Sequence, residues 1–571
     1  MNDRRAANRT RAIASRRGAG LTEKTVRVLQ LLTASIIFAS AVSASAGAQS
    51  ARYPLIPLPS VVESRKGQFE IRKSTALVAP AAFNAVAHRF ARDVANATGF
   101  DLAVISSVGP GRNHIVFVRD AALPREAYTM DVTSARITIR ASAPAGAFYA
   151  LESIKQLLPA AIYRDAPIAG TEWIVPAVHI EDAPRFEWRG MHLDAARHFM
   201  PKEFVKKFVD QLARHKMNRF HWHLTEDQGW RIEIRKYPRL TEVGSCRDQT
   251  LVGPYVTDPA KRVFDGIRHC GFYTQDDIRE VVSYAAERFI TIIPEIEMPG
   301  HAQAAIAAYP ELGVRPDTTV SVLGVWGVSE YILNANASTV SFMQDVLSEV
   351  LGLFPGTYIH IGGDEAVKNQ WKASPQIQAR IKELGLKDEH ELQSWFIRQM
   401  DSFLTARGRR LVGWDEILEG GLAENATVMS WRGVEGGIAA AKAGHDVVMA
   451  PNSHTYFDHA QARDRSAEPL SIGGFLPLDT VYAFEPIPPS LSAAEAKHVL
   501  GAQAQLWSEY LPTPKSVEYM MFPRMAALAE AVWSPKPKRN YEDFMSRLSV
   551  HLTRLQAQDI KFRPLDTKVM K

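Results

Sequence analysis

The sequence contains only two cysteines, Cys246 and Cys270, among its 571 residues. Two thiols are too few for the four-ligand framework of a zinc ribbon. They can form one disulfide or stay as two free thiols, and the sequence leaves both alternatives open.

A net charge is also nearly absent from most of the chain. Residues 1–48 contain eight Lys or Arg and two acidic residues, which leaves 59 basic and 60 acidic residues from position 49 onward. A chain with balanced charge exerts no summed attraction on a phosphate backbone, so we expect no nucleic-acid partner.

Apolar runs long enough to span a membrane are missing beyond residue 48. Within 1–48, a basic region extends to Arg27, an apolar stretch follows, and Ala46-Gly47-Ala48 fits the pattern that a signal peptidase accepts. We therefore expect a cleavable signal peptide over 1–48 and export, to the periplasm or the medium, with no membrane span left after cleavage. A membrane anchor is the alternative, but no basic flank follows the apolar stretch.

Tryptophan is absent from residues 49–172, and all eleven tryptophans lie from Trp173 onward. The early part alternates short β-like runs (76–78, 114–118 and 135–140) with helical patterns (82–98 and 145–158). These patterns predict a small accessory α+β domain over 49–183, which ends near the proline at position 184.

From residue 184 onward, short apolar runs alternate with helical patterns, which is typical of βα units. The predicted strands are 189–194, 218–225, 290–295, 358–362, 410–414, 427–431, 446–450 and 501–507. The predicted helices are 201–215, 274–288, 339–353, 389–408 and 434–443. Eight strands predict an α/β fold with a (β/α)8 TIM barrel as the catalytic domain over 184–571. An open doubly wound sheet is the alternative, but no Gly-rich phosphate turn follows the first strand.

A barrel places its chemistry at the carboxyl ends of the strands. Acidic, basic and aromatic residues occur at the predicted ends of all eight strands: Asp194, Arg197, Glu226, Asp227, Glu295, Glu297, His301, Asp364, Glu365, Trp414, Asp415, Glu416, Trp431, Tyr456, Asp458, Trp507 and Glu509. One such acid alone is more often a solvated charge or a helix cap. Their recurrence after every strand favours a binding site.

The most informative motif is Ile-His-Ile-Gly-Gly-Asp-Glu over 359–365. Two adjacent carboxylates repel each other, so we expect one raised pKa and one group that stays protonated near neutral pH. Glycosidic cleavage uses such an acid to protonate the leaving oxygen. Because successive strand residues point to opposite faces, we do not expect Asp364 and Glu365 to flank one bond as acid and nucleophile. A metal site or a helix N-cap is the alternative.

Three tryptophans, Trp414, Trp431 and Trp507, lie at predicted strand ends, where barrel interiors usually hold branched aliphatic residues. Aromatic faces beside carboxylates and an arginine suit a sugar, which presents C–H faces and hydroxyls. The position of these tryptophans therefore favours a carbohydrate site.

Seven segments follow one another through the predicted barrel: WRGMHLDAARHF (188–199), NRFHWHLTEDQGWR (218–231), PEIEMPGH (294–301), HIGGDE (360–365), GWDE (413–416), MSWRG (429–433) and LWSE (506–509). On these segments the chain resembles glycoside hydrolase family 20, the β-N-acetylhexosaminidases. The region that opens with LIPLP (55–59) is similar to the accessory domain of that family.

The resemblance implies an exo-acting hydrolase that removes terminal β-linked N-acetylglucosamine or N-acetylgalactosamine without a cofactor or a metal. Glu365 would be the general acid and then the base. Asp364 would hold the 2-acetamido N–H and aim the carbonyl oxygen at the anomeric carbon. The substrate would then supply the nucleophile, with an oxazolinium intermediate and net retention.

The resemblance also implies a substrate-binding set. Trp414, Trp431 and Trp507 would surround the acetamido group and the sugar, and Tyr456 would donate to the amide oxygen. Sugar hydroxyls would bind Arg197, Asp458 and Glu509, and the polar network behind the acids would contain His301 and Asp227. Glu226 stands where many members carry aspartate, so it receives no substrate role. The aglycone, the gluco or galacto preference and the oligomeric state stay open.

Two other classes of function compete with this interpretation. A metal-dependent hydrolase could draw ligands from His221, His223, His301 and Asp364, although histidines bonded within the core are the more common case. A non-catalytic carbohydrate-binding protein would keep the aromatic lining, but the intact acid pair argues against it.

Overall fold

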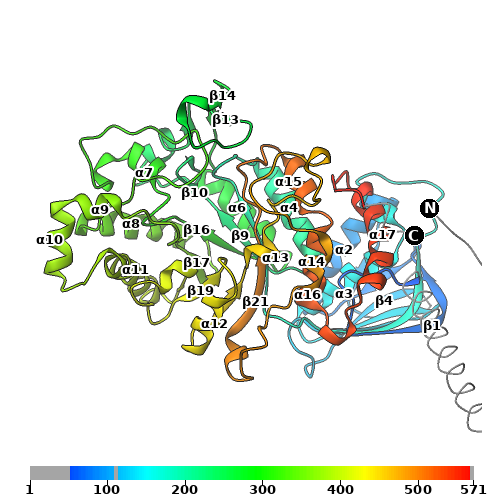
Figure 1. Cartoon of the computed structure of the whole chain (residues 1–571). Coiled ribbons are helices and arrows are strands. Elements are labelled where there is room, and N and C mark those ends of the chain that lie inside the picture. The colour runs from blue at the N-terminus through cyan, green and yellow to red at the C-terminus, as the bar shows by residue number, and fades with distance from the viewer. Residues whose placement is uncertain (1–51, 108–112, 566–571) are drawn as a thin grey trace, which may run out of the picture. The chain divides into compact units, whose positions relative to one another are not determined.

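The computed structural model describes residues 52–107 and 113–565 (Figure 1). The expected signal peptide over 1–48 lies outside these residues. Within the described part of the chain, no helix combines the length and the hydropathy needed to cross a membrane.

The N-terminal part is a seven-stranded mixed sheet with the order β1-β7-β5-β6-β4-β2-β3. Its strands are β1 (Val61–Glu70), β2 (Ala76–Val78), β3 (Ala103–Ile105), β4 (His114–Arg119), β5 (Tyr128–Val132), β6 (Arg136–Ala141) and β7 (Ile174–Asp182). Two helices, α2 (Asn84–Thr98) and α3 (Pro144–Leu157), accompany the sheet. Nearly every residue of α3 is buried, because its rings also contact the barrel part: Phe148 lies 5.4 Å from Phe289 and Tyr149 lies 5.1 Å from Trp533 between ring centroids.

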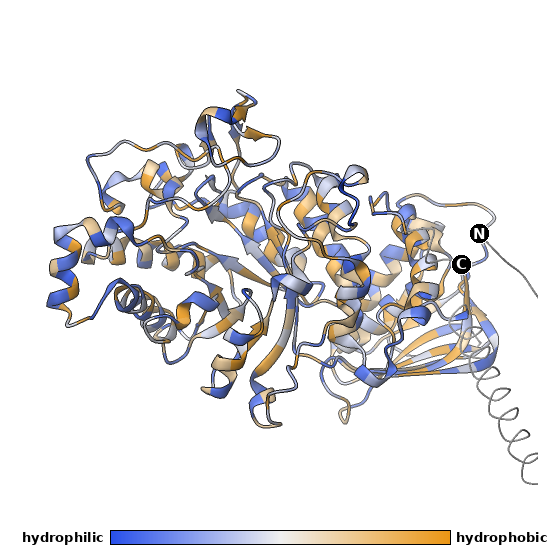
Figure 2. Ribbon diagram, viewed as in Figure 1, coloured by the Kyte–Doolittle hydropathy of each residue, from blue (hydrophilic) through white to orange (hydrophobic). Residues whose placement is uncertain are grey.

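The remaining chain contains the predicted closed parallel barrel. Its strands are β8 (Trp188–Asp194), β9 (Arg219–His223), β16 (Thr291–Glu295), β17 (Tyr358–His360), β18 (Arg410–Trp414), β19 (Thr427–Ser430), β20 (Val447–Met449) and β21 (Val499–Ala504). The helices around it include α4 (Lys202–Arg214), α6 (Gln275–Ala286), α8 (Ala337–Leu353), α11 (Glu389–Thr405), α12 (Glu435–Lys442), α16 (Arg524–Trp533) and α17 (Tyr541–Ala557). Apolar residues (orange in Figure 2) recur along the barrel strands and on helix faces turned toward them. The fold class is confirmed, and the open doubly wound alternative is excluded because β21 pairs with β8 and closes the barrel.

An insertion that is closed by a disulfide lies between β9 and α6, and we call it the disulfide-stapled insertion. Two short antiparallel pairs form it, β12 (Cys246–Arg247) with β15 (His269–Cys270) and β13 (Leu251–Val252) with β14 (Val263–Phe264). Cys246 and Cys270 are opposite each other in the first pair and form a disulfide with a Cα–Cα distance of 4.2 Å.

Candidate active site

A cavity of about 210 Å³ lies at the carboxyl-terminal mouth of the barrel. The predicted residues that line it are Arg197, His301, Asp364, Glu365, Trp414, Trp431, Tyr456, Asp458, Trp507 and Glu509. Asn452, His459, Ile472 and Gly473 complete the lining. Of the predicted set, Asp227 alone lies behind the cavity, where its Oδ2 is 3.4 Å from His301 Nδ1. The barrel therefore brings residues from 197 to 509 in the sequence to one small pocket.

The backbone after β17 turns both acids toward the same side. Gly362 and Gly363 have φ of 66° and 90°, and Glu365 itself has φ of 45°. A Cβ on Gly362 would lie 1.7 Å from Glu297 Oε2, so only glycine fits there. The strand has already ended at His360, and the alternation of strand faces no longer applies. The premise that Asp364 and Glu365 point to opposite faces of a strand is therefore wrong, and the expectation that they do not flank one bond stays a prediction.

His301 lies between the two acids. Its Nε2 is 3.6 Å from Asp364 Oδ2 and 3.4 Å from Glu365 Oε2, and its own φ is 48°. A non-glycine residue in the left-handed region costs about 1–3 kcal/mol and persists where the surroundings impose it. Two such residues, His301 and Glu365, face one pocket, which is the pattern expected of a functional site.

The two acids hold protons differently. Burial raises the pKa of Asp364 to about 7, although the nearby His301 opposes this rise. The hydrogen bond from His301 lowers the pKa of Glu365, whose side chain is 41% exposed. One pKa is raised, as expected for adjacent acids, but in the free site it belongs to Asp364 and not to the expected general acid.

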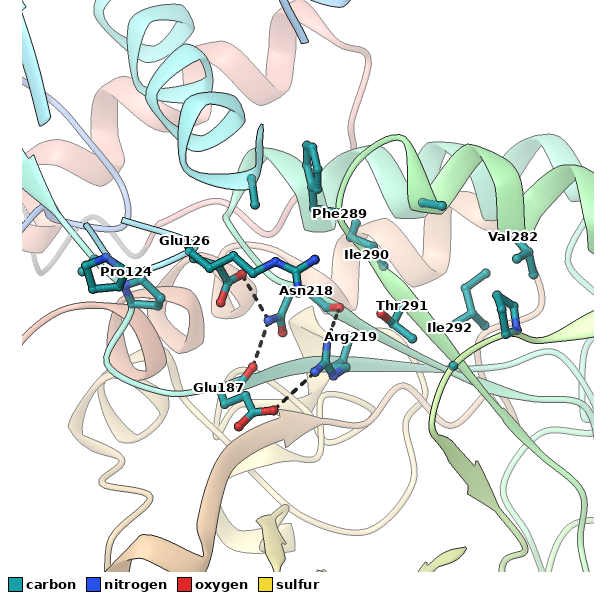
Figure 3. A pocket seen from close by; sticks show the side chains of 17 residues that line it. Pro124, Glu126, Glu187, Asn218, Arg219, Val282, Phe289, Ile290, Thr291 and Ile292 are labelled. Carbon is teal, nitrogen blue, oxygen red and sulfur yellow. Dashed lines mark hydrogen bonds and ion pairs between the residues drawn. The ribbon is translucent and has the colours of Figure 1, made fainter. Parts of the chain in front are cut away.

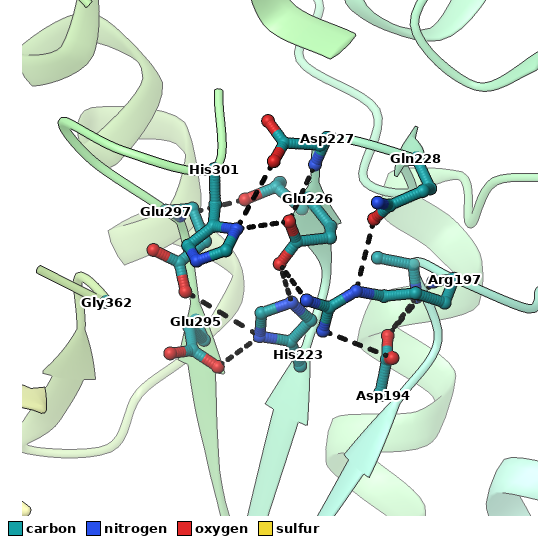
Figure 4. A network of polar contacts seen from close by, with 12 residues as sticks. Asp194, Arg197, His223, Glu226, Asp227, Gln228, Glu295, Glu297, His301 and Gly362 are labelled. Atoms are coloured by element: carbon teal, nitrogen blue, oxygen red, sulfur yellow. Dashed lines mark hydrogen bonds and ion pairs between the residues drawn. The ribbon is translucent and has the colours of Figure 1, made fainter. Parts of the chain in front are cut away.

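Glu226, which received no role from the sequence, connects the two sides of the site (Figure 4). Its Oε1 accepts a hydrogen bond from His301 Nδ1 at 2.6 Å, and its Oε2 lies 3.0 Å from Arg197 Nη2. His223 Nε2 contacts the same Oε2 at 3.2 Å. Glu226 does not line the cavity, so it acts on the pocket only through these neighbours. The glutamate side chain therefore bridges His301 and Arg197, an arrangement that the spacing of these residues in the sequence could not reveal.

Arg197 is held rigidly beside the pocket. Its Nε donates to Gln228 Oε1 at 3.1 Å, its Nη1 lies 3.4 Å from Asp194 Oδ2, and its guanidinium stacks 5.0 Å from the ring centroid of Trp507. Burial opposes its charge, but the carboxylates, Glu226 first, raise the pKa of Arg197 well above its usual value. A guanidinium group with a fixed orientation and a stable positive charge, in a pocket of the size of one sugar, is suited to bind hydroxyl groups.

Three lining carboxyl groups keep one buried oxygen each without a hydrogen-bond partner among the described residues: Asp364 Oδ1, Asp458 Oδ1 and Glu509 Oε2. Buried polar atoms normally have partners, so unpaired atoms around one pocket call for an external explanation. Burial raises the pKa of Asp458 well above its usual range, and also raises that of Glu509. The pocket therefore offers polar oxygens to a ligand that carries several O–H or N–H groups.

The tryptophans form the remaining wall. Trp414 Nε1 donates to Glu295 Oε1 at 2.8 Å, and Trp431 Nε1 donates to Glu416 Oε2 at 2.9 Å. Trp431 stacks on Tyr456 with 6.0 Å between ring centroids. Because these two indole N–H groups are already bonded to acids, the apolar parts of the rings are what the tryptophans present to the pocket.

The histidines considered as metal ligands surround Glu295 inside the barrel. His221 Nε2 lies 3.1 Å from Glu295 Oε2, and His223 Nδ1 forms a very short contact with the same oxygen. Glu295 and the hydrogen bond to Glu226 help to raise the pKa of His223 to about 10 despite burial, so this ring is charged. Burial lowers the pKa of His221 to about 4, and its Nδ1 accepts from Gln503 Nε2 at 2.8 Å, which places its proton on Nε2.

A metal ligand needs a deprotonated nitrogen that faces the ion. His223 is a cation, and the free nitrogen of His221 already accepts a hydrogen bond. Among the described residues, His221 and His223 gather around Glu295, whereas His301 and Asp364 come together with Glu365, so the four residues do not form one ligand group. His221, His223, His301 and Asp364 therefore do not offer one common ligand set for a divalent cation.

A larger cavity, of about 660 Å³, lies at the opposite, amino-terminal ends of the strands (Figure 3). Its lining includes Glu126, Glu187, Asn218 and Arg219. Asn218 donates to the Glu187 backbone oxygen at 2.9 Å, and Glu126 accepts two hydrogen bonds from Arg189 at 2.7 and 3.2 Å. Polar groups here largely satisfy one another, and barrels carry their chemistry at the other end.

An eight-stranded barrel with adjacent acids and an aromatic wall at its mouth defines a hydrolase of the glycosidase class. The model "Glycosyl hydrolase family 20, catalytic domain" matches residues 186–536, and the "domain 2" model of that family matches residues 52–183. The chain therefore belongs to glycosyl hydrolase family 20.

Individual relatives agree with this family. A beta-hexosaminidase of Porphyromonas gingivalis is 46% identical to this chain in the matched region. The match covers 89% of this chain and 64% of that protein. The crystal structure of an exo beta-N-acetylglucosaminidase from Vibrio harveyi with N-acetylglucosamine has a TM-score of 0.79 at 35% identity, covering 90% of this chain and 78% of that one. A Streptomyces coelicolor beta-N-acetylhexosaminidase has a TM-score of 0.77 at 31% identity, covering 90% and 98%.

Sequence reasoning missed the loop part of the pocket as well as Glu226. Asn452, His459, Ile472 and Gly473 lie outside the motifs and between strands, in segments that carry no periodic pattern. Loops that vary freely offer no signal in one sequence.

Proposed function

We propose that the protein removes single terminal, non-reducing, β-linked N-acetylglucosamine or N-acetylgalactosamine units from a glycan. The observation that carries this proposal is the set of three unpaired carboxyl oxygens around a pocket of about 210 Å³. This volume is below the roughly 300–1,000 Å³ of pockets for drug-sized ligands and suits one sugar ring. A pocket of that size at the barrel mouth supports exo action. The bound N-acetylglucosamine in the Vibrio harveyi relative supports the choice of sugar.

The arrangement of acids supports a nucleophile supplied by the substrate. Asp364 and Glu365 both contact His301 Nε2, so they lie on one side of the pocket and do not flank an anomeric carbon. Burial raises the pKa of the other lining acids, Asp458 and Glu509, which disfavours the carboxylate form that a nucleophile needs. The 2-acetamido oxygen of the sugar fills the missing role, through an oxazolinium intermediate and with net retention.

Substrate binding also explains how Glu365 becomes the acid. In the free site the raised pKa of Asp364 keeps a proton near neutrality. An acetamide N–H that donates to Asp364 favours its ionised form, and the shared contact with His301 links Asp364 to Glu365. The proton then resides on Glu365, which protonates the leaving oxygen and later activates water.

We also propose that the protein is exported by cleavage after Ala48 and acts in the periplasm or the medium. The Cys246–Cys270 disulfide supports this location, because such bonds persist in oxidising compartments. Mass measurement of the protein purified from the periplasm or the medium checks the cleavage point.

The substrate is tested by a hydrolysis panel of chitobiose, an N-acetylgalactosaminide and plain glucosides, with Glu365→Gln as the background control. We expect turnover of the N-acetyl glycosides and none of the plain glucosides above that control. Equal cleavage of both groups would contradict acetamide participation.

A further inference from the structure

A second cavity, of about 510 Å³, lies between the disulfide-stapled insertion and residues 320–325. The insertion projects from the barrel at the edge marked by β13 and β14 in Figure 1. Three arginines line the cavity: Arg247 from β12, and Arg262 and Arg268 from the return of the hairpin. None of the roles proposed for the sugar pocket uses these residues.

Among the described residues, no acid forms an ion pair with any of the three arginines, and Asp194 and Asp265 act on Arg247 only from a distance. Arg247 Nε donates to Thr250 Oγ1 at 2.9 Å and its Nη1 donates to the Gln228 backbone oxygen at 3.2 Å, but its buried Nη2 has no hydrogen-bond partner among the described residues. Arg262 donates to the backbone oxygen of Val256 and to the hydroxyl of Tyr255.

Positive charge is therefore unbalanced beneath the insertion. Burial and the neighbouring Arg231 lower the pKa of Arg247 to about 9. Burial, followed by Arg247 and Arg231, lowers the pKa of His269 to about 2. The nearby Asp265 forms no hydrogen bond with Arg247; its Oδ1 accepts from the backbone N–H groups of Thr250 and Ile267.

Two acids also line the cavity, Glu242 and Asp248. Both side chains are exposed, so water and salt screen their charge, whereas Arg247 is only 2% exposed. Arg268 is exposed and is screened in the same way, so the charge that stays unbalanced is that of buried Arg247.

We propose that this cavity binds an anionic group, a carboxylate, sulfate or phosphate, through Arg262 and Arg268 with Arg247 behind them. Guanidinium groups recognise such groups by paired, charge-assisted hydrogen bonds. The anion is either a substituent on the glycan beyond the cleaved bond or a free ion.

The cavity is connected to the sugar pocket by direct bonds. Gln228 accepts from Arg247 through its backbone oxygen and from Arg197 Nε through its side chain. Gln228 Nε2 also donates to the Val325 backbone oxygen at 2.8 Å. The Leu323 backbone N–H donates to the Asp227 backbone oxygen at 3.0 Å. An anion that draws on Arg247 therefore acts on the residues that hold Arg197.

Calorimetric titration of the full chain with sodium sulfate, against sodium chloride at matched ionic strength, tests the site without any turnover, so its result is independent of the proposed hydrolysis. The wild type should bind sulfate, and Arg262→Ala/Arg268→Ala should bind it about tenfold more weakly, since a bond between charged groups contributes on this scale. Arg92→Ala/Arg136→Ala, which removes two exposed arginines of the N-terminal part, is the matched control and should bind as the wild type does. No sulfate binding by the wild type, or equal binding by the Arg262/Arg268 variant, would overturn the proposal.

The source of the anion is distinguished by kinetics on two disaccharides, one neutral and one with a carboxylate on the reducing sugar. A preference for the acidic substrate that falls in the Arg262/Arg268 variant and not in the control supports a glycan substituent. An unchanged preference with lost sulfate binding supports a free anion.

Discussion

The two ends of the barrel differ in a way that locates the chemistry. The amino-terminal cavity, about 660 Å³, is three times the size of the mouth pocket of about 210 Å³, yet among its lining side chains in the described residues only Arg219 Nε is buried without a hydrogen-bond partner. Arg189, fully buried there, forms two bonds to Glu126 and one to the Lys216 oxygen. The mouth keeps unpaired carboxyl oxygens and left-handed residues at its acids. Unpaired carboxyl oxygens that converge on one pocket, and not volume, mark the functional end; a left-handed residue alone does not, because Phe289 at the amino-terminal cavity has φ of 60°.

The largest effect is expected from Glu365→Gln at the mouth. Loss of the general acid should lower kcat on an unactivated glycoside by about 10²–10⁴-fold, with little change in binding. Steady-state kinetics on chitobiose measures this. A glycoside whose leaving group needs no proton should recover most of the rate, and a wild-type rate on chitobiose would remove Glu365 from the mechanism.

Asp364→Asn should follow, with a loss of about 10²–10³-fold in kcat, because an amide does not stabilise the positive charge that develops on the substrate's own acetamide. Unlike Glu365→Gln, this variant should gain little from an activated leaving group. Equal recovery of kcat in the two variants on an activated glycoside would show that Asp364 and Glu365 do not have separate roles.

Glu226→Gln should have a smaller effect and lower kcat/KM by about 10–10²-fold, the range seen when a residue that orients a ligand-binding side chain is replaced. Glu226 favours the charged form of His301, and His301 favours ionised Asp364. Glu226 also raises the pKa of Asp364 directly through its negative charge, so its loss should shift the alkaline limb of kcat/KM, which the pKa of about 7 at Asp364 places near neutrality. A rate loss with an unmoved limb would mean that Glu226 only supports the fold.

The smallest effect on turnover is expected at the amino-terminal end. Arg189→Met leaves Glu126 and the Lys216 oxygen without their partner, so it should lower the free energy of unfolding by about 3 kcal/mol, while kcat per folded molecule stays unchanged. Urea unfolding and active-site titration separate the two quantities. A large fall in kcat with an unchanged free energy of unfolding would contradict the functional difference between the two ends of the barrel.

The fold was predictable because every barrel strand is a short apolar run that ends in polar residues. The acid pair was predictable from 359–365, and the tryptophan wall from its place after strands. The facing of Asp364 and Glu365 was not, because it depends on left-handed φ values at Glu365 and its preceding glycines. The role of Glu226 was hidden for a related reason, since its partners Arg197 and His301 come from different strands.

The central claim is that the sugar's own acetamide attacks the anomeric carbon, and stepwise fluorination of the N-acetyl group tests it most directly. Fluorine weakens the carbonyl oxygen as a nucleophile and changes little else in size. The account predicts that kcat/KM falls steeply from acetyl through difluoroacetyl to trifluoroacetyl, by about tenfold or more. A flat series would show that the protein supplies the nucleophile, and would contradict the account.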